Sequence, residues 1–182
     1  IKAGDGLESG IYPFYTSSET LSKYLNEHQN GPGCLVFGTG GKASVHFTKS
    51  KFATSTDCIS IQPKNTQELF GEYVFQYLKG NMEILEAGFK GAGLKHISKK
   101  YLSEIQIPLP PLDDQKRIAH LLGKVEGMIA QRKQHLQQLD ELLKSVFLEM
   151  FGDPVRNEKG WETSILRDLC GFITKGTTPK SI

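Results

Sequence analysis

Apolar residues recur at alternating steps of four and three positions in the second half of this chain. Between positions 118 and 150, nine of the ten residues at these steps are apolar, and the exception is Arg132. Because a 3.5-residue repeat stays on one side of a slightly under-wound helix, such a helix needs a second helix packed along it. The pattern therefore predicts a coiled-coil helix with these pairing residues: Ile118, Leu122, Val125, Ile129, Leu136, Leu139, Leu143 and Val146.

Both ends of this helix are marked in the sequence. Pro108 to Pro111 form a stiff stretch, and Asp113 and Asp114 then place negative charge at the positive end of a helix dipole. Gly152 followed by Pro154 is a typical helix stop. We therefore expect a helix over 113–150, about 57 Å long at about 1.5 Å per residue. A helix of this length can hold two binding units a fixed distance apart.

Residues 1–112 alternate between short apolar segments and turns, which predicts an α/β (α+β) domain. Strands are expected at 11–15, 34–37, 45–47 and 58–61, separated by glycine-rich turns. The apolar spacing at 66–85 predicts a core-facing helix that Gly88 ends, and Ser98 is suited to cap a short helix through Leu102.

The tail, 151–182, is expected to be a linker followed by the start of a second such domain. Ile173 and Gly176 have the same spacing as Ile1 and Gly4. The chain would then consist of a domain, a helix and the start of another domain, in that order, which fits this interpretation. In an antiparallel pair of helices, the tail of one chain would lie against the first domain of its partner. We therefore expect apolar tail residues to be buried in trans, namely Trp161, Ile165 and Leu169.

Composition argues against several classes of protein. The 182 residues carry a formal net charge of +2, and three scattered cysteines form no CxxC pair for zinc. The sequence contains no membrane-length apolar run and does not open with a secretory signal, so we expect a cytoplasmic protein without membrane contact. The five histidines show no metal-ligand spacing, and no nucleophile has a GxSxG context. We expect neither a catalytic site nor a metal site.

Two windows of the first domain contain no acidic residue, 28–56 and 87–103, and both contain lysines. Such windows suit contact with DNA phosphates, although solvated lysines on loops would give the same pattern. The turn at Gly38 to Gly41 exposes backbone N–H groups, and the polar segment after position 14 can hydrogen-bond to base edges. The candidate DNA-binding residues are Tyr15, Thr16, Ser17, Ser18, Thr39, Lys42, Lys90 and Lys95. Ordinary strand-connecting turns are the alternative for both loops.

The stretch from Ile105 to Ile118, IQIPLPPLDDQKRI, runs directly into the heptad helix and resembles the specificity subunit of type I restriction–modification enzymes. Three further stretches resemble the target-recognition domain of that family: 12–17, 38–57 and 91–102. The resemblance covers essentially the whole chain. The proline-rich junction is its most specific part.

The resemblance implies a non-catalytic subunit that recognises half of a bipartite double-stranded DNA target with each recognition domain. Two antiparallel helices set the gap between the halves in this family. The subunit docks methylation subunits, which bind S-adenosylmethionine, and the holoenzyme adds a restriction subunit. The family usually has two recognition domains and two helices, whereas this chain has one of each. It is then either a piece or a natural half-length form, paired as a homodimer or with a second half of the same subunit.

Two other functions are open at this point. A coiled-coil protein-interaction module without DNA binding would use the same helix as its main contact surface. An enzyme could use the turn at Gly38 to Gly41 to hold a nucleotide, although this turn lacks the spacing of a P-loop.

Overall fold

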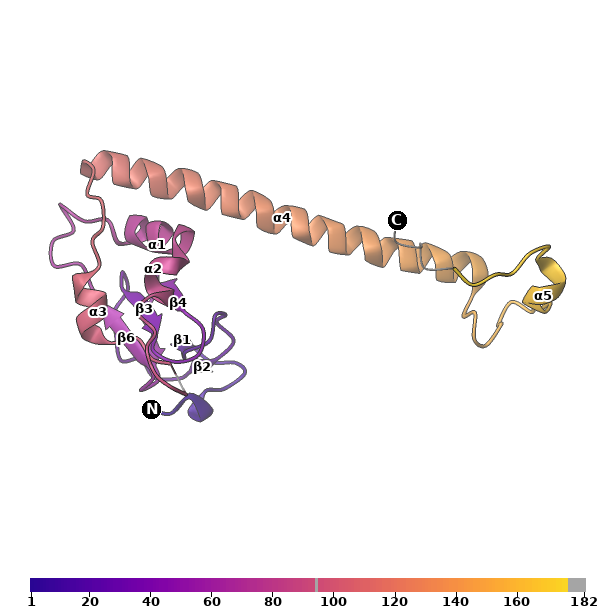
Figure 1. The fold of residues 1–182 in the computed structure, drawn as a ribbon, viewed down its shortest axis with the longest axis horizontal. Coiled ribbons are helices and arrows are strands. Elements are labelled where there is room, and N and C mark those ends of the chain that lie inside the picture. The colour runs from indigo at the N-terminus through magenta and orange to yellow at the C-terminus, as the bar shows by residue number, and fades with distance from the viewer. Residues whose placement is uncertain (94, 177–182) are drawn as a thin grey trace, which may run out of the picture. The chain divides into compact units, whose positions relative to one another are not determined.

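The computed structural model describes residues 1–93 and 95–176. Contacts divide the chain into two units, Ile1–Gly127 and Met128–Ile182. The long helix α4, Leu112–Phe151, crosses this division and is drawn in orange in Figure 1. The observed class is therefore the expected one, a small α/β domain followed by a long helix. None of the helices in the described ranges is long and apolar enough to cross a membrane.

Two three-stranded sheets form the first unit, which opens with a short 3-10 helix, Ala3–Asp5. In the first sheet, β1 (Tyr12–Tyr15) lies antiparallel to β2 (Tyr24–Leu25) and parallel to β5 (Ala53–Thr54). In the second sheet, β3 (Leu35–Gly38) lies between β4 (Ser44–Phe47) and β6 (Cys58–Ile61), antiparallel to both. The four expected strands are thus confirmed, within one residue at either end. The two-residue strands β2 and β5 were not predicted.

The register of the second sheet brings three chain segments together where β3, its central strand, ends. Gly38, the last residue of β3, pairs with Ser44 at the start of β4 and with Cys58 at the start of β6. The loops that follow β3 and precede β6 therefore meet beside the same strand end.

Three shorter helices complete the domain: α1 (Gly71–Gly80), α2 (Met82–Glu86) and α3 (Lys99–Glu104). The single helix expected over 66–85 is wrong in its bounds, because helix begins at Gly71 and is interrupted at Asn81. The Asn81 side chain donates a hydrogen bond to the Tyr77 carbonyl at 2.7 Å and so caps α1. The expected cap at Ser98 is confirmed, since its hydroxyl accepts from the Tyr101 N–H at 3.1 Å.

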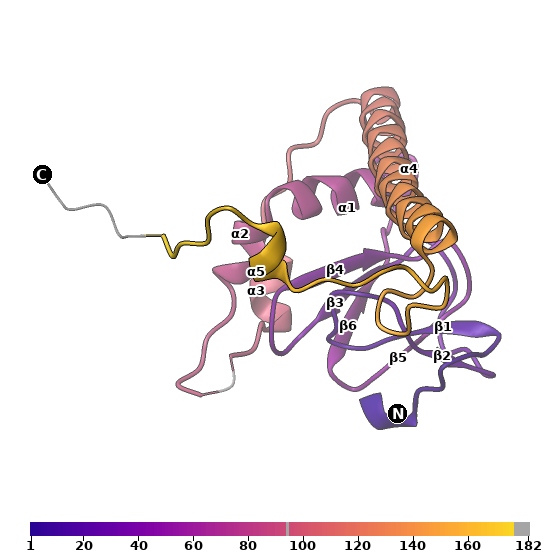
Figure 2. The same cartoon turned by 90° about the vertical axis from the view of Figure 1, so that its right-hand side faces the viewer.

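The core has two layers, one on each face of β3. Leu35 and Phe37 face α1 and α2, which lie over the β4-β3-β6 sheet (Figure 2). Val36 lies in a second cluster with Tyr15 and Phe52. Successive side chains of a strand point to opposite faces, so a strand that is buried on both faces is apolar throughout. This explains the continuous apolar run at 34–37.

Gln115 attaches the start of α4 to the domain. Its side chain is fully buried, at 0 % exposure. The amide oxygen accepts from the Phe70 N–H at 2.9 Å, and the amide nitrogen donates to the carbonyls of Glu68 at 2.9 Å and Pro110 at 2.8 Å. One side chain thus joins α4 to both the segment before α1 and the proline-rich junction.

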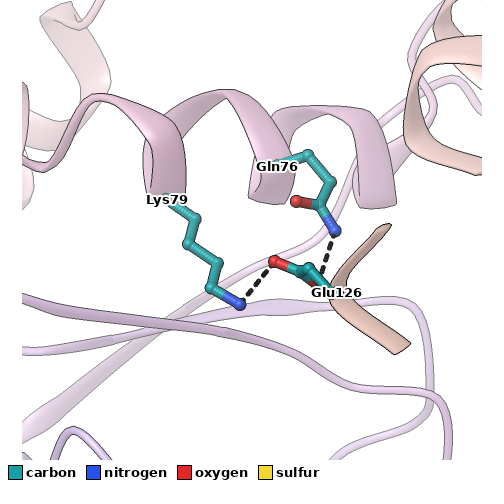
Figure 3. A network of polar contacts seen from close by, with 3 residues as sticks. All are labelled: Gln76, Lys79 and Glu126. Carbon is teal, nitrogen blue, oxygen red and sulfur yellow. Dashed lines mark hydrogen bonds and ion pairs between the residues drawn. The ribbon is translucent and has the colours of Figure 1, made fainter. Parts of the chain in front are cut away.

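A second attachment lies three turns further along α4. The Glu126 carboxylate accepts hydrogen bonds from Lys79 at 2.6 Å and from Gln76 at 3.1 Å, both on α1 (Figure 3). Partial burial alone would raise the pKa of Glu126, but these two hydrogen bonds and the lysine charge outweigh it, so its pKa lies below the ordinary value. The two attachments hold the first part of α4 along α1 (Figure 2).

The second unit contains the rest of α4 and the tail. The helix extends one residue beyond the expected 113–150 at each end, and Gly152 follows it with a φ of 72°, as a glycine stop requires. Lys159 donates to the carbonyls of Glu149 and Met150, and the Trp161 ring N–H donates to that of Phe151 at 3.2 Å. These side chains satisfy the last carbonyls of the helix. A single turn, α5 (Leu166–Leu169), lies further along the tail, whereas residues 177–182 of the expected second domain start lie outside the described residues.

Candidate nucleic-acid interface

Three loops meet at the backbone carbonyl of Asp57. The Ser17 hydroxyl donates to this oxygen at 2.7 Å, the Thr39 hydroxyl at 3.0 Å and the Thr39 N–H at 2.9 Å. The Gly40 N–H in turn donates to the Ser17 hydroxyl at 3.4 Å. The segments 16–19, 39–42 and 55–57, which are distant in sequence, therefore form one surface at the edge of the second sheet.

A fourth segment, of which 90–93 and 95–96 are described, lies beside these loops. Lys90 and His96 exchange backbone hydrogen bonds of 3.1 Å, and His96 also bridges to Gly40. The Ile97 N–H donates to the Thr39 carbonyl at 3.1 Å. This places the exposed residues Lys90 and Lys95 next to the turn at 39–42. We refer to segments 16–19, 39–42, 55–57, 90–93 and 95–96 together as the loop cluster.

Gly38 permits the close approach of the loop at 16–19. A Cβ atom at this position would lie 2.4 Å from the Ser44 hydroxyl oxygen and 2.8 Å from the Ser17 Cα. Such distances are too short for any side chain, so the backbone of the loop can pack directly on the end of β3 only because this residue is glycine. The glycine predicted to make a turn thus also positions a candidate contact loop.

The side chains of the loop cluster differ in exposure. Ser18, Lys42, Lys90 and Lys95 are exposed, whereas Thr16, Ser17 and Thr39 are half-buried. Lys42 lies 3.6 Å from the Glu19 carboxylate, and both side chains are open to solvent. An exposed pair of this kind is weak, so Lys42 can exchange this partner for a phosphate.

Tyr15 requires a correction as a DNA-binding candidate. It is only 8 % exposed, and its ring packs against Phe52 at 5.6 Å and His46 at 5.1 Å between centroids. Desolvation raises its pKa, with a smaller contribution from Tyr24. We therefore assign Tyr15 to the support of the loop that follows it. The His46 ring nitrogen, 3.0 Å from the Ser18 carbonyl, supports the same loop.

Some residues that shape this surface carry no signal in the sequence. Asp57 acts through its carbonyl, which every residue type possesses, and His96 through its main chain. Glu19 lies outside the acid-free window, so the charge pattern does not place it beside Lys42. Only pairing between distant strands brings these residues together.

The His, Cys, Asp and Glu side chains of the described residues do not gather into one metal-binding cluster. Among them, no group of three or more His, Cys, Asp or Glu side chains could hold a metal ion. Burial raises the pKa of the Cys34 and Cys58 thiols, which disfavours the reactive thiolate form.

The pairing residues of α4 are mostly open to solvent. From Leu122 to Val146, the seven predicted positions are between 41 and 71 % exposed. Ile118 differs, because it packs in part against the core of the first unit. A row of exposed apolar side chains of this length fits a helix that has a partner.

Comparison with known proteins identifies the family. Residues 1–141 match the family described as type I restriction modification DNA specificity domain. The chain is 28 % identical over 170 residues to the MjaVIII specificity subunit of Methanocaldococcus jannaschii, covering 88 % of this chain and 40 % of the relative. It is 24 % identical over 135 residues to the EcoDI specificity subunit of Escherichia coli, covering 74 % of this chain and 30 % of the relative. This chain belongs to the type I restriction–modification DNA specificity family.

Solved structures agree on the fold. The type I restriction–modification S subunit from M. genitalium superposes with a TM-score of 0.61 at 18 % identity, covering 82 % of this chain and 39 % of that one. The chain spans less than half the length of each of these relatives. The relatives are named as specificity subunits, in agreement with the expectation of a non-catalytic component.

Proposed function

We propose that this chain binds double-stranded DNA sequence-specifically through the loop cluster and reads one half of a bipartite target. The observation that carries the proposal is the convergence of hydroxyl-bearing and lysine-bearing loops at one end of the second sheet. The loops at 16–19 and 39–42 are joined through the Asp57 carbonyl, and Lys90 and His96 join them through Gly40. Membership of the specificity family supports it. A rigid sheet that presents several loops at one edge is a common platform for recognition.

Each part of the loop cluster suits a different part of DNA. Lys42, Lys90 and Lys95 would contact phosphates, which fix the position of the protein on the duplex. Thr16 and Ser18 carry hydroxyls that both donate and accept, so they suit the base edges in a groove. The Ser17 hydroxyl donates to the Asp57 carbonyl in the free protein, so it would have to give up this bond to donate to a base. Thr39 would hold the glycine turn, whose backbone N–H groups approach the phosphate chain.

The exposed row on α4 is proposed to pair antiparallel with an equivalent helix, from a second copy or from a second half of the same subunit. Such a pair would separate two recognition domains by a fixed distance. We further propose that the assembly docks methylation subunits, which supply S-adenosylmethionine, and a restriction subunit in the cytoplasm. This chain would contribute recognition and spacing, and the bound cofactor would belong to the methylation subunit.

The other function that a specific observation favours is a coiled-coil interaction module without DNA binding. The long apolar row on α4 fits both functions, whereas the loop cluster fits only the first. Binding to random duplex DNA at low salt distinguishes them, because phosphate contacts are strongest there.

The test is selection of bound sequences from a random duplex pool. If the chain pairs with itself, we expect enrichment of two inverted copies of one short motif at a fixed separation, because an antiparallel pair has two-fold symmetry. Two different motifs would indicate pairing with another half subunit. An unenriched pool, together with no binding at low salt, would contradict the proposal and favour the interaction module.

A further inference from the structure

The first unit contains an open apolar cavity that the DNA-binding proposal does not use. Its volume is about 460 Å³, within the size range of sites that bind small molecules or peptide side chains. The walls come from β3, β6, α1, α3 and the stretch before α4. The apolar lining includes Phe37, Ile61, Leu69, Leu78, Ile107 and Leu109.

Two features mark this cavity as a site for an apolar occupant. Leu109 at its edge is 60 % exposed, and Ile61 lies on β6, which pairs with β3 on one side only within the described sheet. Lys64 and Glu68 also line the cavity and supply one charge of each sign. An apolar floor with charged residues beside it suits an amphipathic segment of protein.

The tail of the same chain carries apolar side chains without cover. Ile165, Leu166, Leu169, Phe172 and Ile173 are between 64 and 81 % exposed. Leu166 and Leu169 lie three positions apart on α5 and therefore share a face of that turn. Arg167 and Asp168 stand between them, so the segment also carries one charge of each sign.

We propose that the tail segment 165–173 of one chain docks into the apolar cavity of a second copy. The inference rests on the antiparallel pairing proposed above, in which the end of one α4 lies beside the start of the other. The cavity is lined by Ile105, Ile107 and Leu109, which precede α4, and residues 152–164 join the end of α4 to the docked segment. Docking would therefore add a second contact between the two chains beside the helix interface.

Leu166 and Leu169 would enter the cavity, and Arg167 and Asp168 would face Glu68 and Lys64. The docked segment removes apolar surface from water on both sides.

A disulfide bond can test this contact because the tail carries its own thiol. Cys170 is exposed next to Leu169, whereas Cys34 is buried. The variant Lys64→Cys places a second thiol beside the cavity. Under mild oxidation we expect a linked dimer of twice the 20.2 kDa chain mass. The matched controls are Lys51→Cys, at an exposed position that does not line the cavity, and Lys64→Cys combined with Cys170→Ser. Neither control should link.

The outcomes separate docking from helix pairing when sedimentation is measured on the same samples. A non-covalent dimer that forms no link would overturn docking and leave the pairing intact. A link within one chain, or equal linking from position 51, would also overturn it. Monomers in sedimentation would remove the pairing on which the inference rests.

Alkylation of Cys170 in the unmodified chain gives a second readout that does not perturb the domain. If the docked state of the tail is about ten times more populated than the undocked state in the dimer, dimerisation should slow the alkylation of Cys170 about tenfold. Leu166→Asp with Leu169→Asp should restore the monomer rate while the dimer persists. An alkylation rate that does not change with dimerisation would overturn the inference.

Discussion

Replacing Gln115 by leucine should loosen α4 from the recognition domain. The substitution keeps a side chain of similar size but removes three hydrogen bonds, which leaves the Phe70 N–H and the carbonyls of Glu68 and Pro110 without this partner. A buried group that loses its partner costs about 1–3 kcal/mol, so three such groups, partly rehydrated, should lower the free energy of unfolding by about 3 kcal/mol.

Urea unfolding followed by circular dichroism measures this loss. With a slope of about 2 kcal/mol per molar urea, the midpoint should fall by about 1.5 M. The control is Gln137→Leu on the exposed part of α4, where the side chain bonds only to Glu141 and a change within about 0.5 kcal/mol is expected. Equal midpoints for the two variants would refute the role assigned to Gln115.

Three further predictions concern charge and pairing. Glu19→Gln should strengthen binding to duplex DNA about threefold, because Lys42 loses its weak partner and a negative charge is removed from the surface. Titration with labelled DNA measures this change. Weaker binding by the variant would count against the loop cluster as the DNA interface. The pKa of Glu126 is lowered in the folded protein, so its stabilising contribution is present above the ordinary carboxyl pKa and is lost as pH falls through the lowered value. The free energy of unfolding of the wild type should therefore fall with acid across that range more than that of Glu126→Gln, and parallel pH profiles would contradict the assignment. Leu139→Lys with Leu143→Lys should give monomers in sedimentation at tens of micromolar, since unpaired charge along a packed helix is costly, and persistent dimers would argue against this seam.

The elements that could be predicted from sequence are those specified by local signals. The start of α4 follows from acidic residues after a proline stretch, and its end follows from Gly152, so the predicted bounds differ by one residue at each end. The cap at Ser98 depends on a contact only three residues away. By contrast, the break at Asn81 could not be predicted, because one asparagine in a strongly periodic segment does not identify a helix end.

The candidate site was only partly predictable for the same reason. Residue type identified Lys42, Lys90 and Lys95 as possible phosphate contacts, but it did not show that Lys90 and His96 lie against the turn at 39–42. The hydroxyl of Tyr15 suggests a DNA contact, yet its place at the end of β1 buries it beside Phe52. Exposure and proximity follow from the pairing of distant strands, which spacing along the chain does not encode.

The salt dependence of DNA binding tests the central claim most directly. Lys42→Ala, Lys90→Ala and Lys95→Ala should each weaken binding to duplex DNA and reduce the slope of log affinity against log salt by about 0.9 for each phosphate that the variant no longer neutralises. Lys133→Ala, on the exposed part of α4, is the matched control and should leave the slope unchanged. If the three loop variants keep the wild-type slope, the loop cluster is not the DNA interface.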